Sequence, residues 1–270
     1  MALSPDELQR YARHILLKEI GGPGQEALRQ ARVLVIGAGG LGAPALMYLA
    51  AAGGGTLGVI DDDRVALSNL QRQIIHDTGA VGELKTVSAA RSLQRINPHV
   101  SMEQHPVRLA AHNALAIIAR YDLVVDGSDN FATRFLVSDA CFLAKKTLVS
   151  AAVGQFDGQI STFKPHLPGP RGEKLPTYRC LHREAPPPGS VPTCEEAGIV
   201  GALTGIIGSM QALEAIKEIT GAGDSLAGRI LMYDGLSCRV MSIRLNWDPA
   251  NPLNGDNATI HDLSGHALEG

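Results

Sequence analysis

A glycine-rich turn between an apolar strand and a helix is the feature that most constrains how this chain can fold. The run Val33-Leu34-Val35-Ile36 is apolar and β-branched, and it ends in Gly37-Ala38-Gly39-Gly40-Leu41-Gly42. A helix rich in alanine and leucine is predicted over 43–52. A short strand is predicted over 56–60, and Asp61 stands at its end. This order matches the GxGxxG dinucleotide fingerprint, with the acid nineteen residues beyond the last glycine.

The turn predicts a nucleotide site for a physical reason. Gly37, Gly39 and Gly42 carry no side chains, so backbone N–H groups can approach phosphate oxygens there. The positive end of the following helix dipole points at the same place. Asp61 stands where an acid would hold a ribose hydroxyl. The identity of the nucleotide and of the reaction must come from the rest of the chain.

The rest of the chain continues the alternation of strands and helices. Further strands are predicted over 100–104, 123–126, 147–151, 158–163, 229–233 and 238–245, and further helices over 5–20, 25–31, 82–95, 111–120, 132–145 and 197–220. We expect an α/β fold: a Rossmann-like sheet whose parallel nucleotide-binding half is continued by antiparallel strands, with helices on both faces. Residues 1–245 should form one domain. Residues 246–270, rich in Asn, Asp, Gly and Pro, should form a flexible tail.

Composition argues against several function classes. The net charge of −3 and the lack of a basic excess argue against binding to nucleic acid or a membrane surface, and no apolar run is long enough to span a bilayer. The N-terminus shows no apolar run preceded by positive charge, so no signal peptide is expected. The thiols lack paired spacing and should be reduced, as in a cytoplasmic protein: Cys141, Cys180, Cys194 and Cys238.

A polar segment follows the strand that ends at Asp61. Asp62 and Asp63 are expected to be solvated turn residues. The run Ser68-Asn69-Leu70-Gln71-Arg72-Gln73 is too polar for a core element and too short for a surface helix. Open α/β sheets bind their ligands in loops after strand ends, so this run is a candidate binding segment.

Two further places indicate phosphate chemistry. Lys85 falls in the first turn of the predicted helix 82–95, where a cation opposes the helix dipole. A nearby polyphosphate would explain it, and an exposed lysine is the alternative. The strand over 123–126 ends in Gly127-Ser128-Asp129-Asn130. Asp129 or Asn130 could cap the next helix, and a carboxylate at this end of the sheet could instead hold Mg²⁺ beside phosphates.

Two segments lie outside the repeating units. The predicted N-terminal helix, 5–20, is amphipathic and carries Arg10 and Arg13 on one flank, which by themselves indicate a solvated face. Residues 164–193 hold eight of the fifteen prolines and should form a long loop that ends at Thr193-Cys194. Loops of this length are uncommon in compact domains unless they are functional or mobile.

The complete set of motifs points beyond a generic dinucleotide enzyme. A glycine fingerprint with an acid most often belongs to a nicotinamide or flavin enzyme. Here it occurs with the run 68–73, Lys85, Asp129-Asn130 and Thr193-Cys194, and this set resembles the ThiF/MoeB/HesA family, the bacterial relatives of ubiquitin-activating enzymes. The resemblance spans roughly residues 5–245. Within the family it is most similar to the adenylyltransferases of molybdopterin synthase, with those of the thiamine pathway close behind.

The resemblance implies an ATP- and Mg²⁺-dependent adenylation of a ubiquitin-like sulfur carrier protein, MoaD-like or ThiS-like. The Gly-Gly C-terminus of the carrier would attack the α-phosphate and release pyrophosphate. Like charges oppose this attack, so the catalyst must supply cations and alignment. By matching position, the resemblance places Gly40 and its neighbours at the phosphates, Asp61 at the ribose, Asp129 on Mg²⁺, and Asn69, Arg72 and Lys85 on the polyphosphate.

The resemblance also implies a homodimer and a reactive thiol. Arg13 matches the family position that reaches into the ATP site of the partner subunit. Cys194 matches a cysteine that in parts of the family forms a thioester or persulfide with the carrier. Just ahead of a helix N-terminus its thiolate would be favoured, and a bystander role is the alternative. The loop over 164–193 would be a crossover loop that roofs a channel for the carrier's tail.

One departure from the family concerns zinc. Many relatives hold a structural zinc with two CxxC pairs. Here the first pair is Thr177-Tyr178-Arg179-Cys180, and no cysteine follows Cys238. One thiol cannot build a tetrahedral thiolate site, so no structural zinc is expected.

Two hypotheses compete with adenylation. The fingerprint and Asp61 alone would suit an NAD-dependent oxidoreductase, but no proton donor for hydride chemistry is evident. In such an enzyme Arg72, Lys85 and Asp129 would have no purpose. A nucleotide-binding partner module without catalysis is the third possibility.

Overall fold

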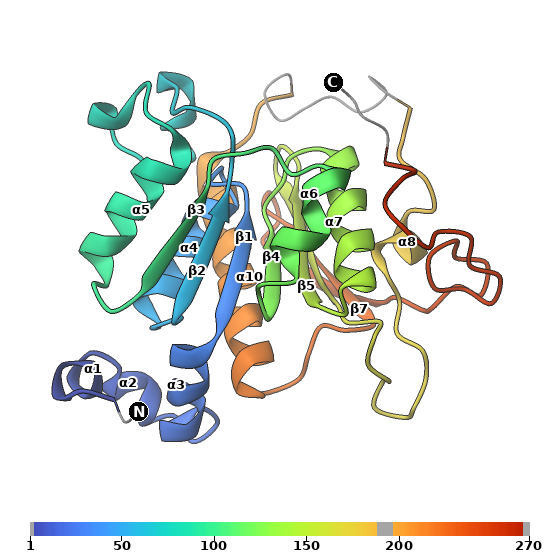
Figure 1. The fold of residues 1–270 in the computed structure, drawn as a ribbon, viewed down its shortest axis with the longest axis horizontal. Helices are drawn as coiled ribbons and strands as arrows, with labels where there is room; N and C mark the ends of the chain where they lie inside the picture. The colour runs from blue at the N-terminus through green and yellow to red at the C-terminus, as the bar shows by residue number, and fades with distance from the viewer. Residues whose placement is uncertain (1–2, 188–196, 267–270) are drawn as a thin grey trace.

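The computed structural model describes residues 3–187 and 197–266, which form one eight-stranded mixed sheet with flanking helices (Figure 1). The strand order is β3-β2-β1-β4-β5-β6-β7-β8. Each predicted strand is present, with its ends shifted by two residues at most. The strands are β1 Arg32–Ile36, β2 Thr56–Ile60, β3 Ser101–His105, β4 Leu123–Asp126, β5 Thr147–Val153, β6 Asp157–Phe163, β7 Arg229–Asp234 and β8 Arg239–Arg244.

The first five strands pair in parallel and the remaining three are added antiparallel. β1 lies between β2 and β4, β3 pairs with β2, and β5 pairs with β4, all in parallel. From β5 to β8 each strand pairs antiparallel with the next. The predicted fold class is confirmed. The direction of strand order reverses between β1 and β4, which is where open α/β sheets leave a crevice for ligands.

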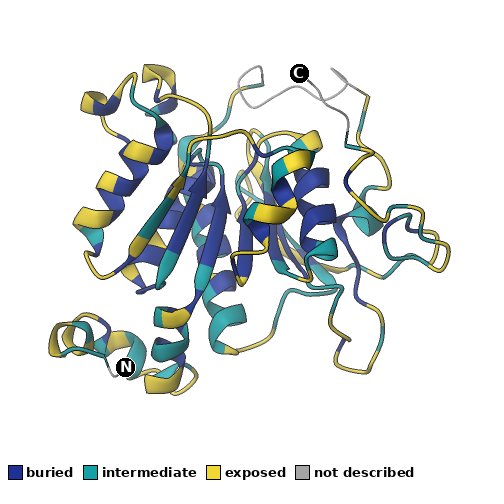
Figure 2. Cartoon of the chain, viewed as in Figure 1, coloured by how far each residue is buried: buried dark blue, intermediate teal, exposed yellow. Residues whose placement is uncertain are grey.

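Helices cover both faces of the sheet, and the central strands between them are buried (Figure 2). One face carries α4 (Gly42–Ala51), α5 (Lys85–Ile96) and α10 (Gly201–Thr220), and the other carries α6 (Ala111–Ile118) and α7 (Phe131–Leu143). Neighbouring residues of a strand point to opposite faces, so Val33 and Val35 join the first core while Leu34 and Ile36 join the second. Within the described ranges, no helix is long and apolar enough to cross a bilayer.

Residues 5–20 form two short helices and a third helix follows them, so the prediction of a single helix over 5–20 was wrong. The interruption falls at Tyr11, whose side chain is buried and whose hydroxyl accepts a 2.8 Å hydrogen bond from Asn97 Nδ2. Leu8 and Leu16, two apolar residues of this segment, are 49% and 73% exposed and so do not form a packed face. The helices are α1 (Pro5–Arg10), α2 (Ala12–Ile15) and α3 (Gly21–Gln30).

The connections between elements contain short ordered pieces. The 3₁₀ helices η1 (Leu67–Asn69) and η2 (Thr78–Ala80) lie between β2 and α5. The loop predicted over 164–193, here called the crossover segment, contains a β-bridge between Pro168 and Lys174 and the one-turn helix α8 (Tyr178–Leu181). The described part of the predicted loop is therefore partly regular, and residues 188–193 lie outside the described residues.

The C-terminal residues 246–266 pack against the domain, which corrects the prediction of a flexible tail for the described part of 246–270. Asn251, Leu253 and Leu263 are 0%, 2% and 4% exposed. The Asn, Asp and Gly content reflects turns whose side chains bond the backbone two residues on, as Asn251 Oδ1 does with the N–H of Leu253 at 2.8 Å. Composition alone could not distinguish such turns from disorder.

Leu253→Ala should lower the free energy of unfolding by about 2–5 kcal/mol, because it leaves a cavity at a fully buried site. The matched control is Leu236→Ala, at a 76% exposed position between β7 and β8. It should change stability by less than about 0.5 kcal/mol. Chemical denaturation of both variants provides the comparison. If the two variants were equally stable, residues 246–266 would be a flexible tail, as the sequence predicted.

Candidate active site

A cavity of about 310 Å³ opens where β1, β2 and β4 end. It lies at the reversal of strand order between β1 and β4. Its walls come from the glycine turn, the acids after β2, the segments after β3 and β4, and the start of α10. Eight of the predicted site residues line it: Gly37, Gly39, Gly40, Asp61, Arg72, Lys85, Asp129 and Asn130.

The glycine turn owes its shape to two backbone requirements. Gly37 has a φ of +85°, a conformation that residues with side chains rarely adopt. A Cβ on Gly42 would lie 1.8 Å from the carbonyl oxygen of Gly37, so only glycine lets α4 begin directly on the turn. Gly42 therefore acts through packing and does not line the cavity. Gly39 is open, since an added Cβ would meet only Gln73 Nε2 at 3.8 Å.

Asp61 directly follows β2 and is held by two backbone donors. Its Oδ2 accepts a 2.8 Å hydrogen bond from the N–H of Ala38, and its Oδ1 accepts one of 2.9 Å from the N–H of Asp63. Burial raises the pKa of Asp61, while the charge of Lys85 and the two N–H donors act to lower it. A carboxylate has about four acceptor sites, so this one can still accept a bond from a ligand hydroxyl in the cavity.

Lys85 is the first residue of α5, and it is buried. Its Nζ lies 2.7 Å from Oδ2 of Asp63, which offsets the cost of burying an ammonium group at the positive end of a helix. Asp62 is exposed as predicted, whereas Asp63 is exposed but paired. Carboxylate oxygens of Asp61, Asp62 and Asp63 lie within 4.8 Å of one another. Lys85 already balances part of the charge of this group.

Only part of the polar run 68–73 faces the cavity, namely Arg72 and Gln73. Asn69 is buried, and its Oδ1 accepts a 3.2 Å hydrogen bond from the N–H of Ala66, so it shapes the loop. The other members are exposed or half-buried and do not line the cavity: Ser68, Leu70 and Gln71. The Ser68 carbonyl accepts a 3.1 Å bond from Nη1 of Arg72.

The two polar residues after β4 have different roles. Asn130 caps α7, because its Oδ1 accepts a 2.8 Å hydrogen bond from the N–H of Thr133. Asp129 is exposed, lines the cavity and accepts only a long bond of 3.3 Å from Asn130 Nδ2 among the described contacts. The capping alternative thus applies to Asn130, and the carboxylate of Asp129 is available to a cation.

Arg134 and Arg108 are cavity residues that the sequence analysis missed. Arg134 stands in the first turn of α7 and is 8% exposed. Its Nη2 donates a 3.0 Å hydrogen bond to the Ser128 carbonyl, and its buried Nε has no partner among the described atoms. The argument applied to Lys85, a cation in a helix's first turn, would have found it. Arg108 is exposed after β3, and no sequence pattern marked it.

Two predicted catalytic residues are not placed in this cavity. Arg13 is exposed in α2, and α2 lies at the opposite end of the sheet from the strand C-termini (Figure 1). It could reach such a cavity only from a second subunit. Cys194 and Thr193 lie outside the described residues, so both alternatives for Cys194 stay predictions. The thiols of the described ranges are free: Cys141, Cys180 and Cys238.

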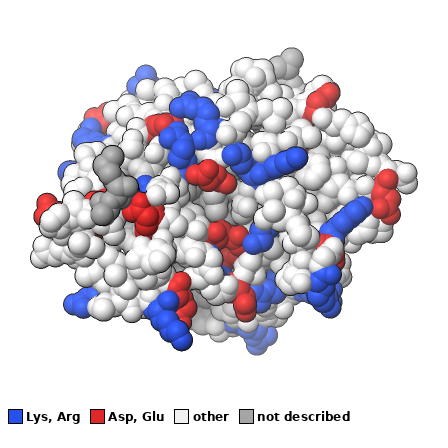
Figure 3. All heavy atoms as spheres, turned by 60° about the horizontal axis from the view of Figure 1, so that its bottom comes forward, with Lys and Arg blue, Asp and Glu red and all other residues white. Residues whose placement is uncertain are grey.

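Charges of both signs meet in the cavity and on the surface. The cavity combines four cations, Arg72, Lys85, Arg108 and Arg134, with four acids, Asp61, Asp62, Asp63 and Asp129. On the face drawn in Figure 3, basic and acidic side chains likewise lie close to one another. Such a cavity can accept a polyanion and a cation together, which is the composition of a nucleotide bound with its metal.

Comparison of the whole sequence with known proteins identifies the family. Residues 11–253 match the ThiF family. This chain belongs to the ThiF family. A "Sulfur carrier protein adenylyltransferase" of Thermus thermophilus is 49% identical over 263 residues, which make up 97% of this chain and 96% of that protein. Its name agrees with the expected enzyme class.

Other ThiF-family relatives are longer than this chain. The Mycobacterium tuberculosis protein named "Probable adenylyltransferase/sulfurtransferase MoeZ" is 49% identical over 251 residues, which cover 93% of this chain and 63% of MoeZ. "Adenylyltransferase and sulfurtransferase MOCS3" of Culex quinquefasciatus is 45% identical, with 97% of this chain and 58% of that protein covered. Among solved structures, E. coli MccB superposes with a TM-score of 0.79 at 21% identity over 91% of this chain and 74% of MccB. That likeness shows a shared fold.

The place considered for zinc is filled by four residues that we call the clasp: Thr177, Cys180, Asp248 and Asn251. Asn251 Nδ2 lies 2.8 Å from Thr177 Oγ1 and 2.9 Å from Cys180 Sγ. The backbone N–H of Asp248 points at the same sulfur from 3.4 Å. Structural zinc takes four thiolate or imidazole ligands, whereas the clasp holds one thiol and its polar groups already bond one another. These residues do not fit a structural zinc.

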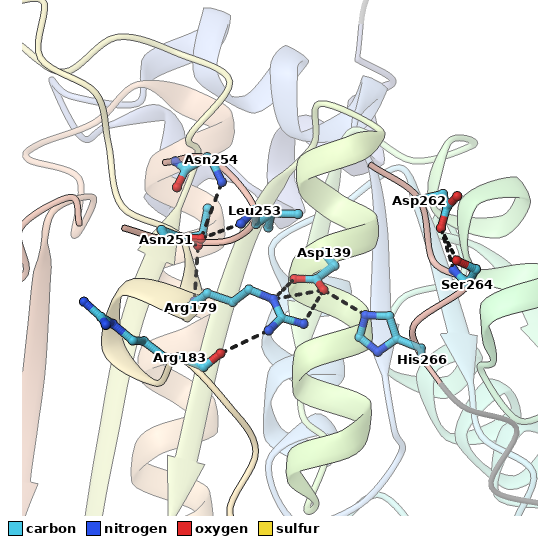
Figure 4. A network of polar contacts seen from close by, with 10 residues as sticks. Asp139, Arg179, Arg183, Asn251, Leu253, Asn254, Asp262, Ser264 and His266 are labelled. Atoms are coloured by element: carbon cyan, nitrogen blue, oxygen red, sulfur yellow. Dashed lines mark hydrogen bonds and ion pairs between the residues drawn. The ribbon is translucent and has the colours of Figure 1, made fainter. Parts of the chain in front are cut away.

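A second network ties the clasp segments to α7 (Figure 4). The carboxylate of Asp139 is fully buried and accepts hydrogen bonds of 2.8 and 2.7 Å from Nε and Nη2 of Arg179. His266 Nε2 lies 2.8 Å from the same carboxylate. Nearby, Nη2 of Arg183 lies 2.8 Å from Oδ2 of Asp248. Side chains therefore join three segments that are far apart in the sequence.

Asn251→Ala should lower the free energy of unfolding by about 1–3 kcal/mol, because a buried hydroxyl and a thiol lose their common donor. Asn257→Ala, at an exposed position of the same segment, is the matched control and should be neutral. Treating the wild-type protein with a chelator should leave its melting temperature unchanged. Stoichiometric zinc in a metal analysis of the purified protein would contradict the clasp interpretation.

Proposed function

We propose that this protein is an ATP-dependent adenylyltransferase that activates the C-terminal Gly-Gly carboxylate of a ubiquitin-like sulfur carrier protein. The observation that carries the proposal is the convergence of the glycine turn, Arg72, Lys85 and Asp129 on one cavity at the switch point of the sheet. The adenylyltransferase name of the Thermus thermophilus relative, which matches over nearly its whole length, supports it.

The reaction brings together two negatively charged groups. A carboxylate oxygen of the carrier forms a bond to the α-phosphorus of ATP, and the bond from that phosphorus to the bridging oxygen of pyrophosphate breaks. Arg72 and Lys85 would offset the repulsion and stabilise the charge that builds up on the phosphates. Asp63 keeps Lys85 paired at 2.7 Å in this structure, so a bound polyphosphate would compete with Asp63 for the ammonium group.

The remaining cavity residues suit the other parts of the nucleotide. The exposed carboxylate of Asp129 would hold Mg²⁺, which neutralises the phosphates and the departing pyrophosphate. The buried Asp61 would accept a ribose hydroxyl. Arg134 lies beside Asp129 in the same cavity and adds a further positive charge.

We assign the carrier to the molybdopterin pathway, as a MoaD-like protein, because the motif set is most similar to that branch of the family. A ThiS-like carrier of the thiamine pathway is the alternative. We place the reaction in the cytoplasm, in keeping with the free thiols of the described residues. The crossover segment would cover the carrier's extended tail, whose two glycines allow passage through a narrow channel.

Arg72→Ala and Asp129→Ala should each reduce carrier-dependent ATP–pyrophosphate exchange by about two orders of magnitude, because each removes a charge that stabilises the reacting phosphates. Arg91→Ala is the matched control. It removes a cation from the same helix as Lys85, but that cation pairs with Glu83 outside the cavity. The measurement uses purified MoaD-like and ThiS-like carriers in separate reactions, and thermal unfolding checks that each variant is folded.

The outcomes distinguish the hypotheses. Exchange with the MoaD-like carrier supports the full proposal. Exchange with the ThiS-like carrier alone supports the adenylyltransferase activity but assigns it to the thiamine pathway. ATP binding without exchange would leave a nucleotide-binding partner module. Binding of NAD(H) in place of ATP with Mg²⁺ would favour an oxidoreductase.

We further propose that the enzyme acts as a homodimer. Arg13 is exposed on α2, away from the cavity of its own subunit. Helices α4 and α10, which pack against each other, leave Tyr48 and Leu213 58% and 59% exposed, and Leu16 after α2 is 73% exposed. Exposed apolar side chains on several packed elements are typical of a surface that contacts another protein.

Arg13→Ala and Asp129→Ala should each reduce exchange by about two orders of magnitude alone, yet their co-expressed mixture should recover roughly a quarter of wild-type exchange. About half of the dimers would be mixed, and each mixed dimer would hold one intact site. Co-expressed Arg72→Ala and Asp129→Ala should show no recovery, because both cavities of the mixed dimer are then damaged. Full activity of Arg13→Ala alone would remove the shared-site proposal.

A further inference from the structure

His76 connects the glycine turn to the helix that carries Lys85. The imidazole is 6% exposed, with Nε2 3.0 Å from the carbonyl oxygen of Ala38 and Nδ1 2.9 Å from Oγ of Ser88 in α5. It does not line the cavity. Its contacts therefore act on the site through the backbone of the turn.

The two partners fix the tautomer of the ring. A carbonyl oxygen only accepts hydrogen bonds, so Nε2 must carry the proton that it donates to Ala38. Nδ1 then accepts the hydrogen bond that the hydroxyl of Ser88 donates. Burial lowers the pKa of His76, and the nearby charge of Lys85 lowers it further, although the bond to Ala38 opposes them. The neutral ring is thus the form present at neutral pH.

The bond to His76 also sets the direction of a backbone donor. In a planar trans peptide, the C=O of Ala38 and the N–H of Gly39 point in opposite directions. The carbonyl points at His76, so the N–H of Gly39 points away from it, and Gly39 lines the cavity. Among the hydrogen bonds between described residues, none uses this N–H. The preceding N–H, that of Ala38, is held by Asp61 at 2.8 Å.

We infer that His76 is a positioning residue of the nucleotide site, which presents the Gly39 N–H to a phosphate oxygen of ATP by holding the Ala38 carbonyl. The inference rests on the proposed function. Glycine at 39 tolerates almost any backbone conformation, so the Ala38–Gly39 peptide could rotate freely unless something holds it. His76 supplies that restraint, and Ser88 keeps the ring in the tautomer that can do so.

The experiment measures ATP–Mg²⁺ binding by calorimetry for the full-length wild type and four variants. His76→Leu removes the donor and should raise the Kd about tenfold, and His76→Gln, whose amide can donate again, should restore it to within about threefold. Ser88→Ala removes the hydroxyl that donates to Nδ1, so the ring proton is no longer confined to Nε2. The Kd should rise several-fold. Ser92→Ala is the matched control, because it removes a buried hydroxyl of the same helix that bonds the carbonyl of Ile75, next to His76 in the chain, and leaves both hydrogen-bond partners of the His76 ring in place. It should leave the Kd unchanged.

The pattern of affinities decides the role of His76. A folded His76→Leu protein with wild-type affinity overturns the inference. If His76→Leu does not fold, the comparison of Ser88→Ala with Ser92→Ala tests the inference instead. Equal affinities of these two variants for ATP overturn it. In steady-state exchange the KM for ATP should rise in His76→Leu while the KM for the carrier stays the same, a split that a general loss of stability would not give. A wild type that fails to bind ATP contradicts the proposed function itself, whatever the variants do.

Discussion

The contact between Gly42 and the carbonyl of Gly37 is the constraint on which the rest of the site depends. A Cβ at 1.8 Å from that oxygen is impossible, so α4 can begin on the end of β1 only with glycine there. This contact aims the helix dipole at the cavity and leaves Gly39 open to it. The backbone of Ala38 is then held on both sides, its N–H by Asp61 and its carbonyl by His76. The turn is made of flexible residues, but these two side chains fix its backbone. Its N–H donors therefore point in defined directions.

Part of the charge at this end of the sheet is balanced before any ligand arrives. Lys85 and Asp63 form an ion pair at 2.7 Å, and Asp61 is held by backbone donors despite burial that raises its pKa. Burying an isolated charge costs several kcal/mol, so such pairing is what lets cations lie in a partly closed cavity. Arg134, in contrast, has a buried Nε with no partner among the described atoms.

The C-terminal segment, residues 246–266, stabilises the side of the sheet that carries α7. The clasp and the buried Asp139 join the crossover segment, α7 and residues 246–266 through side-chain hydrogen bonds and one buried ion pair. Each group in these networks has a partner, which is the condition under which buried polar residues stabilise rather than destabilise a fold. The same networks position residues 177–183 of the crossover segment, which the proposed reaction would use to cover the carrier's tail.

The sequence by itself determined the strands, the parallel half of the sheet and most of the cavity, because each of these follows from a local pattern: strand runs, glycines with a fixed spacing, and polar residues directly after strand ends. Asp61 and Asp129 could be predicted to converge because parallel strands end at one edge, whereas the resemblance to the family placed Arg72 and Lys85 beside them. Only the tertiary structure decided the break at Tyr11, the packing of residues 246–266, and the roles of Asn69, Arg134 and His76. Each of those depends on a partner far away in the chain, such as Asn97 for Tyr11 and Ala38 for His76. Contacts of that kind are set by how the elements pack, and no local periodicity records them.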